Sequence, residues 1–198
     1  LIKLGEKNKM IITISGQAGS GKSSVARYLS ENLKLKHHSM GDLRRKMARD
    51  RNLNLAKLNE LGEKEEFTDK QVDEMQTEIG KKEDNFVMDG RLSYYFIPNS
   101  IKIYLKANLR VRAERVYNDE RVEENFRDLG DSIASLIERE KSDQRRYKKY
   151  YNIDTTNELQ YDVVIDTSRL GIEEVGEKII EFLKKENIIK EAIQTKPE

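Results

Sequence analysis

The sequence predicts an α/β fold with a doubly wound, five-stranded parallel sheet. Short apolar runs alternate with amphipathic stretches along most of the 198 residues, as in strand–helix–strand units with parallel strands. The first apolar run leads into a glycine-rich turn and then into a helical pattern, which is the usual setting of a phosphate-binding loop. We therefore expect one domain with a ligand crevice at the carboxyl ends of its strands.

The core elements follow in order along the chain. Residues 10–15 form a continuous apolar run, which is typical of a parallel strand buried on both faces. Residues 23–33 repeat apolar side chains at the spacing of a helix that packs on a sheet. The remaining expected strands are residues 35–38, 85–89, 101–105 and 161–166, and the remaining core helices are residues 108–120, about 127–151 and 171–185.

A polar helical stretch interrupts this core between residues 41 and 82. We expect it to form a mobile helical substrate lobe, with helix breaks at Gly62 and Gly80. A single domain is expected over residues 1–187, with the polar tail fraying. Its parts are a core at about 10–40 and 85–187, the lobe at about 41–82, a helical lid at about 121–151, and a tail at 188–198 that includes Ile188 and Ile189.

The composition limits the classes of partner. The chain has 37 basic and 36 acidic side chains and a net charge of +1, so no overall charge steers it to nucleic acid or to an anionic membrane. It has no cysteine, which excludes disulfides, thiolate zinc sites and cysteine nucleophiles. No N-terminal stretch has the pattern of a signal peptide or the length of a membrane span. We expect a cytoplasmic monomer without nucleic-acid or membrane partners.

One segment has the G-x-x-x-x-G-K-S spacing of a phosphate-binding loop. Backbone N–H groups and the positive end of the following helix converge in such a loop. Lys22 is expected to reach the β- and γ-phosphates, and the Ser23 hydroxyl to ligate Mg²⁺. A turn that merely connects strand to helix is the alternative, but both the spacing and the context favour a phosphate site. The expected nucleotide-binding residues are Gly16, Gln17, Ala18, Gly19, Ser20, Gly21, Lys22, Ser23 and Ser24.

Charged residues elsewhere in the chain indicate which groups bind the phosphate and its acceptor. Arg139, Asp143 and Arg146 stand at positions i, i+4 and i+7, so they share one helix face and suggest a shared ligand. On spacing alone, a solvated helix with internal ion pairs explains them equally well. Asp89 and Arg91 follow a predicted strand, so both are expected to look into the crevice. Asp89 is placed there to hold Mg²⁺, directly or through water.

In these features the chain resembles the cytidylate kinases of compact form, within the nucleoside monophosphate kinases. The resemblance covers about residues 10–185. A phosphate loop alone is widespread, whereas its combination with G-R-L and R-x-x-x-D-x-x-R is far more specific. The other matching motifs, in order, are SMGDLRR at 39–45, DGRLS at 89–93, IYLKA at 103–107, RAER at 112–115, REKSDQRRY at 139–147 and YDVVIDTS at 161–168.

The resemblance implies phosphorylation of CMP, and also of dCMP, with ATP as donor together with Mg²⁺. It assigns Arg45 to the acceptor phosphate and Arg91 to the acceptor nucleotide. It assigns Arg139, Asp143 and Arg146 to a lid that holds the acceptor and closes over the transferring group. Arg115, and with weaker support Arg112, match the arginine pair at the base of the lid, and residues 166–168 would lie near the donor adenine.

The implied mechanism is direct in-line transfer. The dispersed negative charge of the transferring group needs compensation, and the acceptor is already an anion, so no general base is required. The expected catalytic residues are Lys22, Arg115, Arg139 and Arg146; the expected substrate-binding residues are Arg45, Arg91 and Asp143; and the expected metal ligands are Ser23 and Asp89.

Two departures from the family pattern leave alternatives open. Gln17 and Ala18 stand where relatives often have proline, and Ser93-Tyr94-Tyr95 replaces a segment that contains Gly-Trp in many relatives. The second departure puts the base specificity in doubt. A kinase of AMP, UMP or a small metabolite therefore remains an alternative. A nucleotide-dependent switch or ATPase is another, although no N-K-x-D guanine-reading motif is present.

Two further groups of residues have competing interpretations. Adjacent histidines at 37 and 38 fit a strand end better than a metal site, since no carboxylate stands at a ligand spacing nearby in the sequence. Residues 94–96 are aromatic and either stack on the acceptor base or pack in the core. Tyr147, Tyr150 and Tyr151 are expected to anchor the lid helix to the body of the protein.

Overall fold

The computed structural model describes residues 9–119 and 126–189, and within them it shows the predicted five-stranded parallel sheet. The strand order is β2-β3-β1-β4-β5. In the register of the central strands, Ile14 of β1 lies opposite Asp89 of β3 and Ile103 of β4. The strands are β1 (Ile11–Gly16), β2 (Lys36–Ser39), β3 (Phe86–Asp89), β4 (Ile101–Lys106) and β5 (Val163–Asp166).

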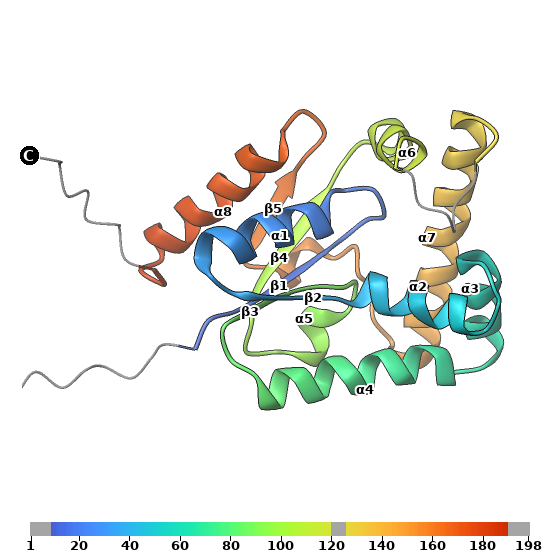
Figure 1. Ribbon diagram of the computed structural model, residues 1–198, viewed down its shortest axis with the longest axis horizontal. Helices are drawn as coiled ribbons and strands as arrows, with labels where there is room; N and C mark the ends of the chain where they lie inside the picture. The colour runs from blue at the N-terminus through green and yellow to red at the C-terminus, as the bar shows by residue number, and fades with distance from the viewer. Residues whose placement is uncertain (1–8, 120–125, 190–198) are drawn as a thin grey trace, which may run out of the picture.

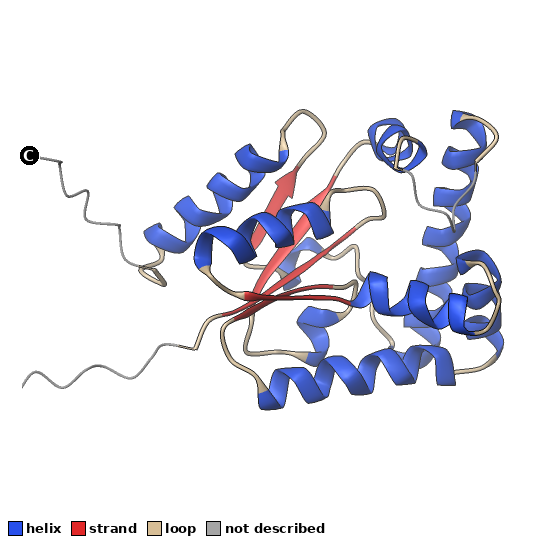
Figure 2. Ribbon diagram, viewed as in Figure 1, coloured by secondary structure: helices blue, strands red, loops and turns tan. Residues whose placement is uncertain are grey.

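Helices cover both faces of the sheet (Figures 1 and 2). On one face α1 and α8 pack together over the strands, and on the other lie α4 and the short α5, which was not predicted. The helices are α1 (Lys22–Leu33), α2 (Met40–Asp50), α3 (Leu55–Lys64), α4 (Phe67–Lys82), α5 (Ser93–Phe96), α6 (Leu109–Tyr117), α7 (Leu129–Tyr151) and α8 (Ile172–Lys185).

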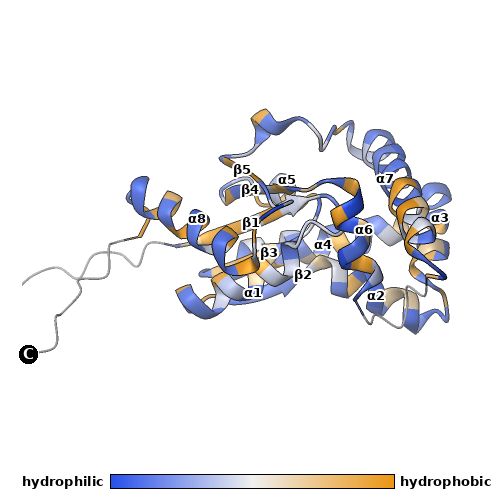
Figure 3. Ribbon diagram, turned by 90° about the horizontal axis from the view of Figure 1, so that it is seen from above, coloured by the Kyte–Doolittle hydropathy of each residue, from blue (hydrophilic) through white to orange (hydrophobic). Residues whose placement is uncertain are grey.

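Apolar side chains gather where the helices meet the sheet. Figure 3 shows hydrophobic colour concentrated along the central strands and alternating with hydrophilic colour along α7 and α8. Ile12 and Ile14 of β1 are fully buried among residues of α1 and α8. This packing fixes the carboxyl end of β1, from which the phosphate-binding loop departs.

The lobe between β2 and β3 is helical as predicted, but the two predicted breaks are wrong. Gly62 lies within α3 and Gly80 within α4. The helices break instead at residues 51–54 and 65–66, and the Asn54 side chain caps α3 by accepting from the backbone N–H of Lys57. A Cβ on Gly80 would lie 2.9 Å from Cγ1 of Ile97. Glycine is therefore used there for close packing, not for ending a helix.

The ends of the predicted lid and tail fall partly outside the described residues. Residues 120–125, which include the predicted end of the 108–120 helix and the start of the lid, are among those not described. Ile188 and Ile189, at the start of the expected tail, pack against the cluster formed by α1, α8 and the sheet. Residues 190–198 are not described. In the described ranges, no helix is both long enough and apolar enough to cross a bilayer.

Candidate active site

The phosphate-binding loop has the predicted strand–turn–helix setting. It joins the end of β1 to the start of α1. Three of its glycines have positive φ, with values of 137° at Gly16, 77° at Gly19 and 93° at Gly21. A Cβ on Gly16 would lie 2.0 Å from the carbonyl oxygen of Leu105 in β4. Both the backbone conformation and the close approach therefore require glycine at the start of the loop.

The interior of the loop is braced by its own polar groups. The Gln17 carbonyl accepts hydrogen bonds from Lys22 Nζ at 2.5 Å and from Ser20 Oγ at 2.8 Å. The Gln17 side chain accepts from the backbone N–H of Ala107, beyond β4. Desolvation, followed by the nearby charge of Arg91, lowers the pKa of Lys22 well below its usual value. A phosphate in the loop would favour the charged form of Lys22 and reverse this effect.

A cleft of about 530 Å³ extends from this loop to the helical lobe and to α7. Of the expected site residues, Gly16, Gln17 and Arg146 do not line it. Gly16 and Gln17 line a smaller cavity of about 60 Å³ instead. The expected residues that line the cleft are Ala18, Gly19, Ser20, Gly21, Lys22, Ser23, Ser24, Arg45, Asp89, Arg91, Arg115, Arg139 and Asp143.

Asp89 and Ser23 meet at the mouth of the loop. Ser23 Oγ donates a hydrogen bond to Asp89 Oδ2 at 2.8 Å, and Ser39 Oγ donates to the same oxygen at 3.1 Å. The Asp89 side chain is almost fully buried. A hydroxyl and a carboxylate side by side form a hard oxygen donor set, which suits a Mg²⁺ ion that keeps waters and phosphate oxygens as its other ligands. The residues therefore fit the expected metal.

His37 completes the surroundings of Asp89. Its Nε2 lies 2.6 Å from Asp89 Oδ1. His37 lies in β2, as the strand interpretation predicted, but a carboxylate is close to it in space. Sequence reasoning missed this contact because the two residues are 52 positions apart and become neighbours only through the β2–β3 pairing. In the described residues, no cluster of three or more histidine or acidic side chains could hold a metal ion by itself.

The predicted shared face of α7 forms an ion network. Asp143 contacts the guanidinium groups of both Arg91 and Arg146. Arg146 is almost fully buried, and its Nη1 donates to both oxygens of Asp69 in α4, at 2.8 and 3.0 Å. Burial alone would raise the pKa of Asp143, but Arg91, Arg146 and Arg139 hold it below its usual value. Asp69, which sequence reasoning missed, thus ties the lid helix to the lobe.

Two arginines at the cleft keep unused donors. Arg44 Nη2 and Arg91 Nη2 are buried and have no hydrogen-bond partner among residues 9–119 and 126–189, and both residues line the cleft. Arg44 is held by hydrogen bonds to Asn59 at 2.9 Å and Asp69 at 3.2 Å. Arg45, the expected ligand of the acceptor phosphate, lines the cleft and contacts Asp42. Buried donors that lack partners beside a cleft are suited to the oxygens of an anionic ligand.

The two arginines of α6 have different surroundings. Arg115 donates to Thr167 Oγ1 at 3.0 Å and to the Thr167 carbonyl at 2.7 Å, at the side of the cleft where the segment after β5 begins. Arg112 does not line the cleft. It is buried and donates to the carbonyls of Ala107 and Ala18 and to Glu140. Arg112 therefore fastens the loop to α6 and α7.

The aromatic residues after β3 contact other aromatic side chains and do not line the cleft. Tyr94 stacks near Tyr161, with ring centroids 4.8 Å apart. Tyr95 and Phe96 contact Tyr151 of α7. None of residues 94–96 is among the described lining of the cleft, so they are not placed to stack on a base. Core packing accounts for Tyr94, whereas Tyr95 is exposed.

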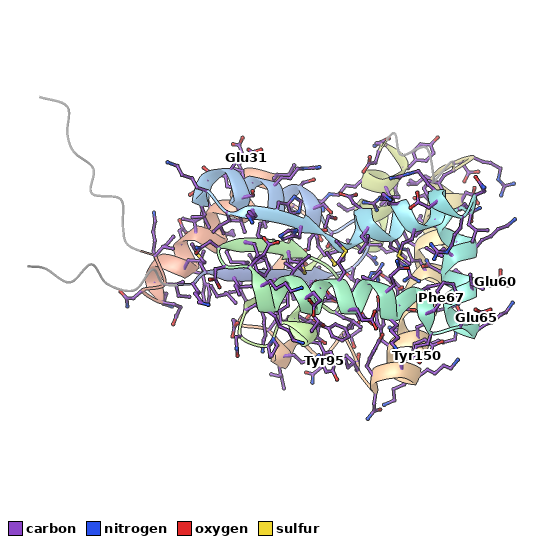
Figure 4. The ribbon with its side chains drawn as sticks, turned by 60° about the horizontal axis from the view of Figure 1, so that its bottom comes forward. Glu31, Glu60, Glu65, Phe67, Tyr95 and Tyr150 are labelled. Atoms are coloured by element: carbon purple, nitrogen blue, oxygen red, sulfur yellow. The ribbon has the colours of Figure 1, made fainter. Side chains whose placement is uncertain are left out.

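Two of the tyrosines expected to anchor the lid helix contact the lobe. Tyr150 donates to the carbonyl of Gly62 at 2.8 Å, and the Tyr151 hydroxyl donates to Asp73. Figure 4 labels both Tyr150 and Tyr95, and Tyr95 is exposed. Tyr147 instead packs in the aromatic cluster that includes Tyr94 and Tyr161.

Comparisons with known proteins agree in sequence and in fold. The model of the cytidylate kinase-like family matches residues 11–169. A cytidylate kinase from Methanocella arvoryzae is 40% identical over 179 residues, which cover 89% of this chain and 99% of that protein. A cytidylate kinase from Methanocaldococcus jannaschii is 37% identical over 171 residues, covering 84% and 93% of the two chains.

Solved structures share the fold at low sequence identity. An uncharacterised protein from Eubacterium ventriosum has a TM-score of 0.65 and 19% identity, with 89% of this chain and 99% of that chain covered. A shikimate kinase from Acinetobacter baumannii has a TM-score of 0.59 and 16% identity, with 92% and 97% covered.

Proposed function

Since this chain belongs to the cytidylate kinase-like family, we propose that it transfers the γ-phosphoryl group of ATP to CMP. The match to curated cytidylate kinases over nearly their whole length carries this proposal. The cleft supports this proposal, because one continuous space joins the phosphate-binding loop to the helical lobe between β2 and β3. Donor and acceptor can therefore meet in it. The shikimate kinase shares the fold alone and gives no support to shikimate as the acceptor.

The donor end of the cleft fits ATP with Mg²⁺. The loop N–H groups and Lys22 would hold the β- and γ-phosphates, and Ser23 and Asp89 would hold the metal. Mg²⁺, when bound, neutralises charge on the phosphate oxygens. Arg115 and Thr167, on the same side of the cleft as Leu170 and Ile172, would flank the rest of the donor nucleotide.

The acceptor end would hold the monophosphate with arginines. Arg45 and Arg91 line it, and Arg44 adds a buried donor without a partner. Arg139 and Asp143 reach the cleft from α7, where Arg139 would compensate charge on the transferring group. Because the acceptor oxygen is already anionic, these residues orient and stabilise without removing a proton.

Arg146 lies farther from the cleft than the lid motif suggested. It is buried between Asp69 and Asp143 and does not line the cleft. In our proposal it remains part of the lid set and acts through the network that holds Asp143 and joins lid to lobe. We also propose that dCMP is an acceptor and that the enzyme is a monomer.

The acceptor is identified by offering monophosphates separately. ADP formation from ATP and Mg²⁺ would be measured with CMP, dCMP, UMP, AMP or GMP, for the wild type and for the Lys22→Ala and Arg91→Ala variants. We expect strong stimulation by CMP and dCMP that both variants lose. ATP turnover that no monophosphate stimulates would refute the proposal and favour an ATPase or a kinase of another metabolite.

A further inference from the structure

The acceptor end of the cleft contains a carboxylate that forms no ion pair with any described residue. Asp73 lies on α4, half-buried, and lines the cleft beside Val72 and Gln76. Its hydrogen bonds in the described structure come from two neutral groups, the Tyr151 hydroxyl and Gln76 Nε2, the latter at 2.9 Å. Asp69, one turn earlier, is instead engaged by Arg44 and Arg146. Asp73 therefore presents an acceptor outside any ion pair of the described residues to whatever occupies the cleft.

Hydrogen bonds that run from Ser93 through Gln76 fix the orientation of the Asp73 carboxylate. Ser93 Oγ donates to Gln76 Oε1 at 2.9 Å, and both side chains are almost fully buried. This bond turns the amide nitrogen of Gln76 towards Asp73. A carboxylate has about four lone-pair sites, and the two neutral donors use only part of them. Asp73 is thus held rigidly with acceptor capacity left over.

The charge state of Asp73 suits an acceptor role at neutral pH. Burial is the main cause that raises the pKa of Asp73 to about 6, and Asp69 raises it further. Hydrogen bonds from Tyr151 and Gln76 and the charge of Arg44 act in the opposite direction. Asp73 is therefore mostly ionised above pH 7, and a ligand that donates to it would relieve part of the cost of its burial.

We propose that Asp73 accepts a hydrogen bond from the exocyclic 4-amino group of the acceptor base, and so selects cytosine over uracil. This inference rests on the proposed function. Cytosine presents an amino donor at the position where uracil presents a carbonyl acceptor, and acidic side chains pair with the cytosine amino group. An ionised carboxylate attracts the first group and repels the second. Met40, Val72 and Leu92, in the same cleft, supply apolar contacts for a flat base.

The isosteric variant Asp73→Asn tests this assignment. Its amide can donate to the uracil carbonyl, so the discrimination should collapse or reverse. We expect kcat/KM for CMP to fall about 10- to 100-fold, the range for losing a hydrogen bond to a charged group, and kcat/KM for UMP to rise. The control Glu74→Gln makes the same acid-to-amide change at an exposed position of α4 that does not line the cleft, and should leave both values unchanged.

A second variant separates base reading from lid anchoring. Tyr151→Phe removes the hydroxyl that joins α7 to Asp73 but keeps the carboxylate. We expect it to change kcat/KM for CMP and UMP by the same factor, so that their ratio stays constant. A Tyr151→Phe variant that loses the CMP preference as fully as Asp73→Asn would overturn the proposal, since the carboxylate would then act only through the lid.

A substrate analogue gives a test that does not depend on the variants folding. The wild type would be offered the monophosphate of the pyrimidin-2-one ribonucleoside, which lacks only the amino group. We expect kcat/KM about 10- to 100-fold below that for CMP. If CMP is a good substrate of the wild type but the analogue is equally good, Asp73 does not read the base while the proposed function stands. Absence of CMP turnover in the wild type would instead refute the proposed function itself.

Discussion

At the scale of single residues, the arginines around the cleft differ in what holds them. Arg112 and Arg146 are buried in contacts with the protein, whereas Arg91, Arg115 and Arg139 line the cleft. This difference separates arginines that shape the site from those placed to meet phosphate. It is visible only in the structure, because all of these residues stand at helical spacings or in motifs that look alike in the sequence.

Arg139→Ala should lower kcat for CMP phosphorylation by about 10³-fold, as expected when an arginine that stabilises a transferring phosphoryl group is lost. Steady-state kinetics with saturating ATP and CMP would measure it. Arg110→Ala is the matched control, since Arg110 lies on the exposed side of α6 and pairs with Glu114. Loss of less than about tenfold for Arg139→Ala would exclude it from compensating the transition-state charge.

His37→Ala should raise the Mg²⁺ concentration needed for half-maximal activity, because Asp89 would lose the partner that fixes one of its oxygens. Removing a group that orients a metal ligand typically weakens metal affinity about 10-fold or more. A Mg²⁺ titration at saturating nucleotides measures the effect. The neighbouring His38 contacts Glu83 instead, so His38→Ala should keep the wild-type titration, and identical titrations for the two variants would contradict the assigned role.

Asp73 also predicts a pH dependence of stability. Its pKa is raised from 3.8 to about 6 by burial first and by Asp69 second. A carboxyl group whose pKa is raised by folding contributes most to stability below its unfolded-state pKa. This contribution is lost as the pH rises through about 6. Asp73→Asn removes the titration. Its free energy of unfolding relative to wild type should therefore rise by up to about 3 kcal/mol between pH 4 and pH 7, as measured by urea unfolding. A constant difference across that range would show that Asp73 does not titrate in this way.

At the scale of elements, α7 is joined to the helical lobe by several polar contacts. Arg146 reaches Asp69, Tyr150 reaches the carbonyl of Gly62, and Arg145 pairs with Glu63. The buried pair of Arg146 and Asp69 dominates, since an exposed pair such as that of Arg145 adds little. We therefore expect this buried contact to contribute most, among these polar contacts, to the relative placement of lid and lobe.

Asp69→Ala should therefore destabilise the protein by about 3 kcal/mol, because it removes the carboxylate that accepts hydrogen bonds from the buried guanidinium groups of Arg146 and Arg44, although Arg146 keeps its pair with Asp143. Thermal or urea unfolding would measure the change. Asp50→Ala is the control on the same lobe, where an exposed pair with Lys46 is lost, and should cost less than about 1 kcal/mol. Equal costs for the two variants would mean that the Asp69 contact does not hold the lobe to α7.

The sequence predicted the elements whose signal is local and missed what depends on distant partners. The strands, the phosphate loop and α7 have continuous apolar runs, a fixed motif or a helical period, and all are confirmed. The helix breaks were wrong because Gly80 is needed for contact with Ile97, seventeen positions away. For the same reason sequence reasoning missed Asp69 and the contact of His37 with Asp89, since neither residue has a sequence neighbour that reveals its partner.

At the scale of the whole molecule, segments far apart in the sequence meet at one cleft. The loop after β1, the helix that follows β2, the end of β3, the first half of α4, α6, α7 and the segment after β5 all contribute lining residues. The parallel order places the carboxyl ends of the strands together, where α/β proteins bind ligands. The phosphate end of this cleft was predictable from motifs, as were Arg45, Arg91 and Asp143 at the acceptor end, whereas the contribution of α4 became visible only in the structure.

The fate of the γ-phosphate tests most directly whether the protein transfers the γ-phosphoryl group of ATP to CMP. The wild type would be incubated with γ-labelled ATP, Mg²⁺ and CMP, and the labelled products separated by chromatography. We expect the label to pass to CDP, with little inorganic phosphate released, and Lys22→Ala to abolish the transfer. Label that accumulates as inorganic phosphate at the same rate with and without CMP would contradict the proposed function, because the cleft would then serve hydrolysis and not transfer to a nucleotide.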